Sequence, residues 1–280
     1  MSSREVYPNA PLVLVAAEIR HPDAGTLSDR EKQQLKRALA DELPVARPLN
    51  RPAGMVATIG PGVAATQFQP TPAISSPRFL SRDLVTSATF HADAVVIETT
   101  EYPGFEAFLA LTQRVLSARL SVGSLDGVER LGLRYIDEIR VPSVGDTSSW
   151  RDWIGPTLLG PNHLADQLEL TNDAWQGIST YSGKLDAGDF EQMSLVLRYG
   201  TGEGYALAPD GDLRRKTPPP GPFFLIDIDS YWGPATQAVP ELDLNAVTSA
   251  LEALHGPVRT LFESSITDRL RDEVLRRNGK

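Results

Sequence analysis

Hydrophobic and polar residues alternate most clearly over residues 129–141, which read ERLGLRYIDEIRV. Successive side chains of a β-strand point to opposite faces. One face would then carry Leu131, Leu133, Tyr135, Ile139 and Val141. The other would carry Arg130, Gly132, Arg134, Ile136, Glu138 and Arg140. The pattern predicts a strand with one apolar face and one charged face.

Shorter apolar or alternating runs, bounded by glycine, proline, asparagine or aspartate, predict further strands. They cover residues 12–20, 55–59, 64–69, 84–91, 94–99, 174–182, 192–199, 205–208 and 223–229. The strands at 84–91 and 94–99 are expected to form a hairpin. The glycine-rich run 200–204, GTGEG, is expected to be a turn between strands rather than a phosphate-binding loop, because no helix follows it.

Helices are predicted where apolar residues recur every three or four positions. They cover residues 29–43, 105–120, 244–262 and 268–277, with a short helix near 163–168. Ser28 is expected to cap the first helix, with Glu31 completing a capping box. Thr267 is expected to cap the last helix.

Strands and helices follow one another in groups rather than in strict alternation. This order predicts the α+β class: a mixed, mainly antiparallel sheet packed with three or four amphipathic helices. A strand–helix–strand unit at residues 94–141 is its clearest piece. We expect residues 1–280 to form a single integrated protein, with a sub-domain boundary near residues 143–150 as an alternative.

Composition narrows the classes of function. The chain has no cysteine, which excludes disulfides, thiolate nucleophiles and cysteine-based metal sites. Its net charge of −9 disfavours nucleic acid as a partner. No apolar run is long enough to predict a membrane span or a signal peptide, so we expect a soluble, acidic, cytoplasmic protein without membrane association.

Charged residues on predicted strands are the candidate ligand-binding residues. They are Glu18, Arg20, Arg130, Arg134, Glu138 and Arg140. If these strands are neighbours, the side chains could line a polar groove for a phosphorylated ligand. The alternative is cross-strand ion pairing on an exposed sheet face, which we favour.

Asp227 and Asp229 follow alternation and so share one face of their strand. Such a pair could hold Mg²⁺ or Mn²⁺. The alternative is a solvated face or pairing with arginine. The four histidines show no zinc-site spacing, and the basic run Arg214-Arg215-Lys216 is interpreted as a solvated loop. The four tryptophans, concentrated in the second half, are expected to pack under loops.

Several segments resemble the sporadically distributed bacterial protein family of unknown function. They are Tyr7-Pro8-Asn9-Ala10-Pro11-Leu12, Glu18-Ile19-Arg20, residues 98–105 with Phe108, residues 130–136, residues 225–229, Leu254-His255, Phe262-Glu263 and Ile266-Thr267-Asp268. The resemblance spans nearly the whole chain and implies a bacterial origin. The family has no assigned activity, so the resemblance implies no catalytic residues.

Two functional hypotheses follow. The first is a non-enzymatic interaction or accessory protein, of a mobile or defence-type system, with a protein partner, no cofactor, and self-association left open. The second is a binder or hydrolase of a phosphorylated ligand or nucleotide that uses the charged strand face and Mg²⁺ or Mn²⁺.

Overall fold

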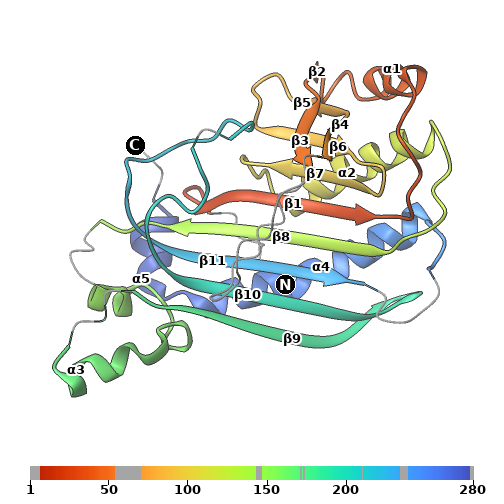
Figure 1. Cartoon of the computed structure of the whole chain (residues 1–280). Coiled ribbons are helices and arrows are strands. Elements are labelled where there is room, and N and C mark those ends of the chain that lie inside the picture. Colours follow the sequence, from red (N-terminus) through yellow and green to blue (C-terminus); the bar gives the residue numbers. More distant parts are fainter. Residues whose placement is uncertain are drawn as a thin grey trace.

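A computed structural model describes residues 7–53, 71–142, 147–170, 172, 174–209, 211–233 and 239–277. Within these residues, nine strands form one sheet in the order β2-β5-β6-β7-β1-β8-β11-β10-β9, and β3 pairs with β4 (Figure 1). The strands expected at 55–59 and 64–69 lie outside the described residues.

The strands have the following bounds. They are β1 (Leu12–Arg20), β2 (Val45–Ala46), β3 (Leu49–Ala53), β4 (Thr71–Ser76), β5 (Arg78–Leu80), β6 (Thr86–Phe90), β7 (Ala94–Thr99), β8 (Arg130–Ile139), β9 (Gln176–Ala187), β10 (Phe190–Gly204) and β11 (Gly221–Trp232). Every neighbouring pair among them is antiparallel, so the mixed character expected of the sheet is absent from the described residues.

The helices confirm the α+β class. They are α1 (Asp29–Ala38), α2 (Phe105–Leu120), α3 (Ala165–Leu168), α4 (Leu244–Ser265) and α5 (Asp268–Leu270), with short 3₁₀ turns at Thr147–Asp152, Pro156–Leu158 and Gly160–Leu164 and a π turn at Arg271–Leu275. Ser28 and Glu31 form the expected capping box, and Thr267 caps α5. No helix among the described residues is long and apolar enough to cross a membrane.

The strand–helix–strand unit is β7, α2 and β8, and β1 lies between its two strands. Both β7 and β8 are antiparallel to β1, so they are parallel to each other. This split arrangement lets α2 cross one face of the sheet. The strands β9, β10 and β11 then continue the sheet beyond β8, so strands from both sides of residues 143–150 are hydrogen-bonded neighbours.

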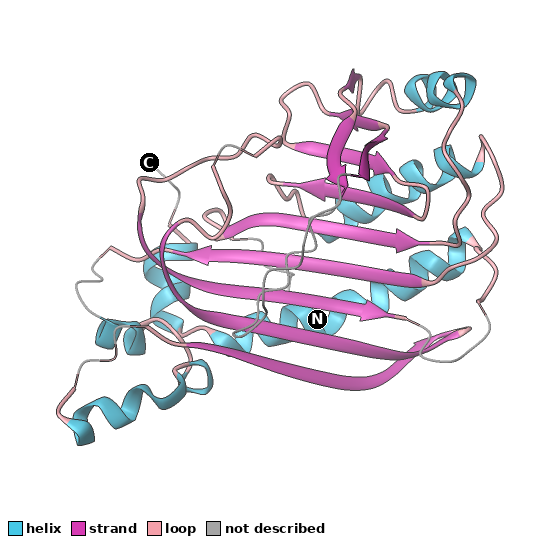
Figure 2. Cartoon of the chain, in the orientation of Figure 1, coloured by secondary structure: helices cyan, strands magenta, loops and turns pink. Residues whose placement is uncertain are grey.

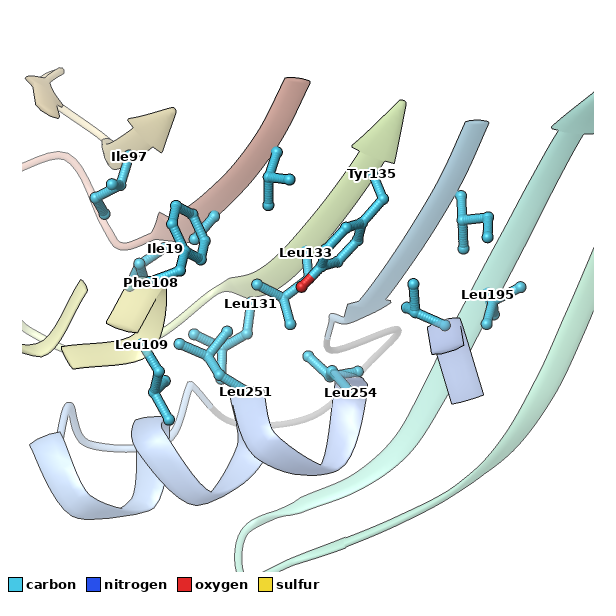
Figure 3. Packing of buried hydrophobic residues seen from close by; sticks show 14 of the residues in the cluster. Ile19, Ile97, Phe108, Leu109, Leu131, Leu133, Tyr135, Leu195, Leu251 and Leu254 are labelled. Carbon is cyan, nitrogen blue, oxygen red and sulfur yellow. The ribbon is translucent and has the colours of Figure 1, made fainter. Parts of the chain in front are cut away.

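The core lies between one face of the sheet and the helices α2 and α4, which are behind the sheet in Figure 2. Leu131 and Leu133 of β8 face Leu251 and Leu254 of α4 (Figure 3). All four tryptophans are buried, as expected, and lie within this same hydrophobic cluster. The opposite face of β1, β8 and β11 carries the charged side chains.

Three predictions about local structure are wrong. The run 200–204 is part of β10 and not a turn, because its glycines allow close approach. A side chain at position 202 would collide with the ring of Phe223, and one at position 200 with the backbone of Trp175. Residues 205–208 are not a strand, and α1 ends at Ala38, where turns replace the helix expected up to residue 43.

Candidate functional site

The charged residues predicted from the sequence lie on three neighbouring strands, β1, β8 and β11. At one end, Arg130 bridges Glu18 of β1 and Asp229 of β11, with 3.1 Å between its Nη2 and the Asp229 carboxylate. Its guanidinium folds back over Gly132, where any side chain would collide with it. Arg20 joins this group through a 2.8 Å bond from its Nε to Glu18.

Further along β8, Arg134 donates two hydrogen bonds to Asp227, at 2.8 Å from Nε and 2.7 Å from Nη2. Arg198 of β10 lies 3.7 Å from the same carboxylate. At the far end of β8, Glu138 accepts a hydrogen bond from Arg140 at 2.8 Å and another from the backbone N–H of Ala206 at 2.7 Å.

The eight candidate residues therefore form three ion-pair groups along the sheet. Each arginine among them already has a carboxylate partner, and each carboxylate has an arginine. The groups of Arg130 and Arg134 are paired across strands, as favoured from the sequence, whereas Glu138 and Arg140 are two positions apart on one segment. Asp227 and Glu138 are buried, so the exposed sheet face expected with this pairing is wrong for both carboxylates. None of the eight lines either pocket described below.

The proposed metal ligands are engaged in the same pairs. Asp227 is held by Arg134, and Asp229 by Arg130. No group of three histidine, aspartate or glutamate side chains in the described parts of the chain could hold a metal ion. A metal on Asp227 and Asp229 would have to displace both guanidinium groups, and it stays a prediction.

A pocket of about 480 Å³ opens on the other face of the sheet, where the helices pack. We call it the Asp137 pocket. Residues from five parts of the chain line it: the segment that leads into β1, the start of α2, strand β8, strand β11, and α4. Its size and its mainly apolar wall are typical of sites for small organic ligands.

Asp137 is the one acidic residue on the apolar face of β8, with the same parity as Leu133 and Tyr135. It is only 4% exposed, and no hydrogen bond or ion pair joins its carboxyl group to another described residue. Burial raises the pKa of Asp137 from 3.8 to about 8, and the charge of Asp227 on the opposite face adds to the rise. The group is therefore mainly neutral at neutral pH, and it is available to a polar partner in the pocket.

Aromatic rings form the wall beside Asp137. The Tyr135 hydroxyl lies 3.1 Å from Nδ1 of His255 and 3.4 Å from the Tyr102 hydroxyl. Tyr135 shares its face of β8 with Leu131 and Leu133, as Figure 3 shows. His255 stacks on Phe105, with ring centroids 3.9 Å apart. Burial raises the pKa of Tyr102 to about 12 and that of Tyr135 well above 10, so both hydroxyls stay protonated.

The segment before β1 forms part of the pocket wall, and several hydrogen bonds hold it in place. The Tyr7 hydroxyl donates to the carboxylate of Glu263 on α4 at 3.0 Å. The N–H of Asn9 donates to the carbonyl of Leu275, and the N–H of Glu138 to the carbonyl of Pro11. Arg259 of α4 adds a cationic side chain to the lining.

The sequence patterns assigned no role to Asp137, Tyr135 or His255. One signal was present, because an aspartate at an apolar position of an alternating strand breaks the pattern. A buried carboxyl group in such a position needs either a partner or a shifted pKa.

No model of a known protein family matches the chain, and no curated protein matches it. The resemblance to the sporadically distributed bacterial family therefore stays a prediction.

Proposed function

We propose that the chain binds a small organic molecule in the Asp137 pocket. The ligand has an apolar or aromatic body, which packs on the rings of Phe105, His255 and Tyr102, and one polar group, which pairs with Asp137. The observation that carries the proposal is the Asp137 carboxyl group, which is almost fully buried in the wall of an open pocket and has no hydrogen bond or ion pair to another described residue.

Physical reasoning supports a ligand at this position. A buried polar group without a hydrogen bond costs roughly 1–3 kcal/mol, and a partner brought by a ligand removes that cost. The aromatic rings offer apolar area to the remainder of the molecule. The protonated carboxyl group can donate a hydrogen bond, and the ionised form can accept one or pair with a cation.

A fragment screen tests the proposal. Three probes share a phenyl ring and differ in charge: 2-phenylethylamine, 2-phenylacetamide and phenylacetate. Saturation-transfer NMR on the full chain should detect at least one of them. Ala107, which is exposed at the mouth of the pocket, is changed to Trp to block entry.

The matched control is Ala110→Trp, which adds the same ring to an exposed position of α2 outside the pocket lining. Binding that disappears in Ala107→Trp and persists in Ala110→Trp supports the proposal. Binding of a probe that is equal in both variants, or no binding of any probe, contradicts it.

The expected protein partner stays a prediction, and one observation bears on where it would bind. Among the described residues, strand β9 is the last strand of the sheet, and its Ile178 and Tyr181 are 71% and 51% exposed. A free strand edge can pair with a second copy of the chain. Sedimentation equilibrium of the wild type and Ile178→Lys tests this: self-association that the variant abolishes supports it, and a monomeric wild type contradicts it.

The second hypothesis, a phosphorylated ligand on the charged strand face with Mg²⁺ or Mn²⁺, also stays a prediction. A phosphate there would compete with carboxylates for Arg130, Arg134 and Arg140, all of which are paired. In the Asp137 pocket, a ligand would not have to displace an ion-pair partner from Asp137. For that reason we favour the Asp137 pocket as the ligand site.

A further inference from the structure

A second pocket, of about 350 Å³, lies beneath the connection between β10 and β11. We call it the Arg215 pocket. The connection reaches across to the other half of the sheet, where the N–H of Arg214 donates to the carbonyl of Leu84 at 2.8 Å. Charged residues in the lining are Arg78, Glu98, Asp212 and Arg215.

Arg215 is a buried cation with unused hydrogen-bond donors. Its side chain is 4% exposed, so the solvated loop expected from the sequence is wrong for this residue. Its Nη2 donates to the carbonyl of Leu207, whereas Nε and Nη1 are buried and have no hydrogen-bond partner. Nη1 makes a long ion pair with Oε2 of Glu138, at 3.8 Å, which is beyond hydrogen-bonding distance. The oxygens of Glu138 already accept hydrogen bonds from Arg140 and Ala206.

Arg78 of β5, which also lines the pocket, is likewise a buried cation with a hydrogen-bond donor that has no partner. Its side chain is 6% exposed, and its Nε is buried without a hydrogen-bond partner. Nη1 donates to Asp212 at 2.8 Å, while Glu98 lies 3.9 Å from Nη2, beyond hydrogen-bonding distance. Asp212 itself is 67% exposed, so its carboxylate can leave Arg78 for water at little cost.

The lining therefore offers more N–H donors than acceptors, and both guanidinium groups are desolvated. A tetrahedral oxyanion provides several acceptors at once, and arginine binds phosphate through paired, charge-assisted hydrogen bonds. We propose that the Arg215 pocket binds a small phosphate-type oxyanion, which replaces Asp212 on Arg78 and supplies acceptors to Arg215. In the absence of the ligand, the Asp212 carboxylate accepts the hydrogen bond from Arg78 that the oxyanion would accept.

The site differs from both sites considered above. It uses neither the paired arginines of the charged strand face nor any residue of the Asp137 pocket. Its volume lies near the lower end of the range for small-molecule sites, about 300–1,000 Å³, which suits a phosphate with a small organic group.

Isothermal titration calorimetry of the full chain at fixed ionic strength tests the proposal. The probes are inorganic phosphate, phenyl phosphate and acetate. Wild type should bind both phosphates more tightly than acetate. Asp212→Asn should bind phosphate about twofold to fivefold more tightly, because it removes a competing carboxylate from Arg78. Asp186→Asn makes the same charge change at an exposed position of β9 and should match the wild type.

A third variant, Arg215→Gln, should lose phosphate binding. If this variant does not fold, the comparison of phosphate binding by Asp212→Asn and Asp186→Asn tests the proposal instead.

The proposal is overturned if phosphate binds neither the wild type nor Asp212→Asn. It is also overturned if Asp212→Asn and Asp186→Asn bind phosphate more tightly by the same factor. Acetate that binds as tightly as phosphate overturns the assignment to phosphate. Ala107→Trp should leave phosphate binding unchanged, which separates this test from that of the Asp137 pocket.

Discussion

Replacing Asp137 by Asn should remove a large pH dependence of stability. In the folded state the pKa of Asp137 is about 8, against an ordinary value of 3.8. The folded state therefore holds a proton that the unfolded state releases between these two pH values. Because the unfolded state binds fewer protons there, the free energy of unfolding falls as pH rises through this window.

The magnitude follows from the pKa shift. Each unit of pKa difference corresponds to about 1.4 kcal/mol, so the loss across the whole window approaches roughly 6 kcal/mol. The amide of Asn cannot ionise and avoids this loss. Between about pH 4 and about pH 7, Asp137→Asn should gain about 4 kcal/mol of stability relative to the wild type.

Urea denaturation followed by tryptophan fluorescence provides the assay, because all four tryptophans are buried in the folded state. The difference in the free energy of unfolding between the two proteins is measured as a function of pH. Subtraction removes the contribution of all other titrating groups. The control is Asp41→Asn, at an exposed position in the turn after α1.

Curves for wild type and Asp137→Asn that stay parallel from about pH 5 to about pH 8 would refute the reasoning. They would mean that Asp137 ionises normally, and the pocket would then lack the neutral carboxyl group on which its chemistry depends.

Three further predictions concern the fold. Leu254→Ala, in the fully buried part of α4, should cost about 2–5 kcal/mol in urea denaturation, whereas Leu168→Ala, at a position 62% exposed, should change stability by less than about 0.5 kcal/mol. Ser28→Ala breaks the capping box of α1 and should cost about 1 kcal/mol, and an unchanged denaturation midpoint would contradict the role of the cap. Burial lowers the pKa of His21, so the unfolded state takes up the proton first; wild type should lose stability below about pH 6.5 more steeply than His21→Asn, and equal slopes would contradict this.

Local sequence patterns predicted the elements that local interactions decide. Alternation located β8, and the spacing of Ser28 and Glu31 located the start of α1, because both depend on residues close in the chain. The pairing of β8 with β11 joins residues far apart in the chain, such as Arg134 and Asp229, which are 95 positions apart, and no local signal fixes such a register.

The arrangement of the candidate site depends on strand register and tertiary packing, which local sequence patterns do not determine. The charged residues do lie on neighbouring strands, but whether they pair with one another or face a ligand is decided by the register and by the connection after β10. The Asp137 pocket joins residues near both ends of the chain, from Tyr7 to Glu263, and only the tertiary fold brings them together. The glycines at 200–204 predicted a turn but belong to β10, because glycine occurs both in turns and where strands pack closely.

The most direct test of the proposed function is whether ligand binding changes the protonation of Asp137. Calorimetric titration with the tightest of the three phenyl probes, near pH 8 and in two buffers of different ionisation enthalpy, measures the protons taken up or released on binding. A ligand that pairs with Asp137 shifts the pKa of this group, so wild type should exchange a fraction of a proton that Asp137→Asn does not exchange. Equal proton exchange in both proteins, or none in the wild type, would contradict the account.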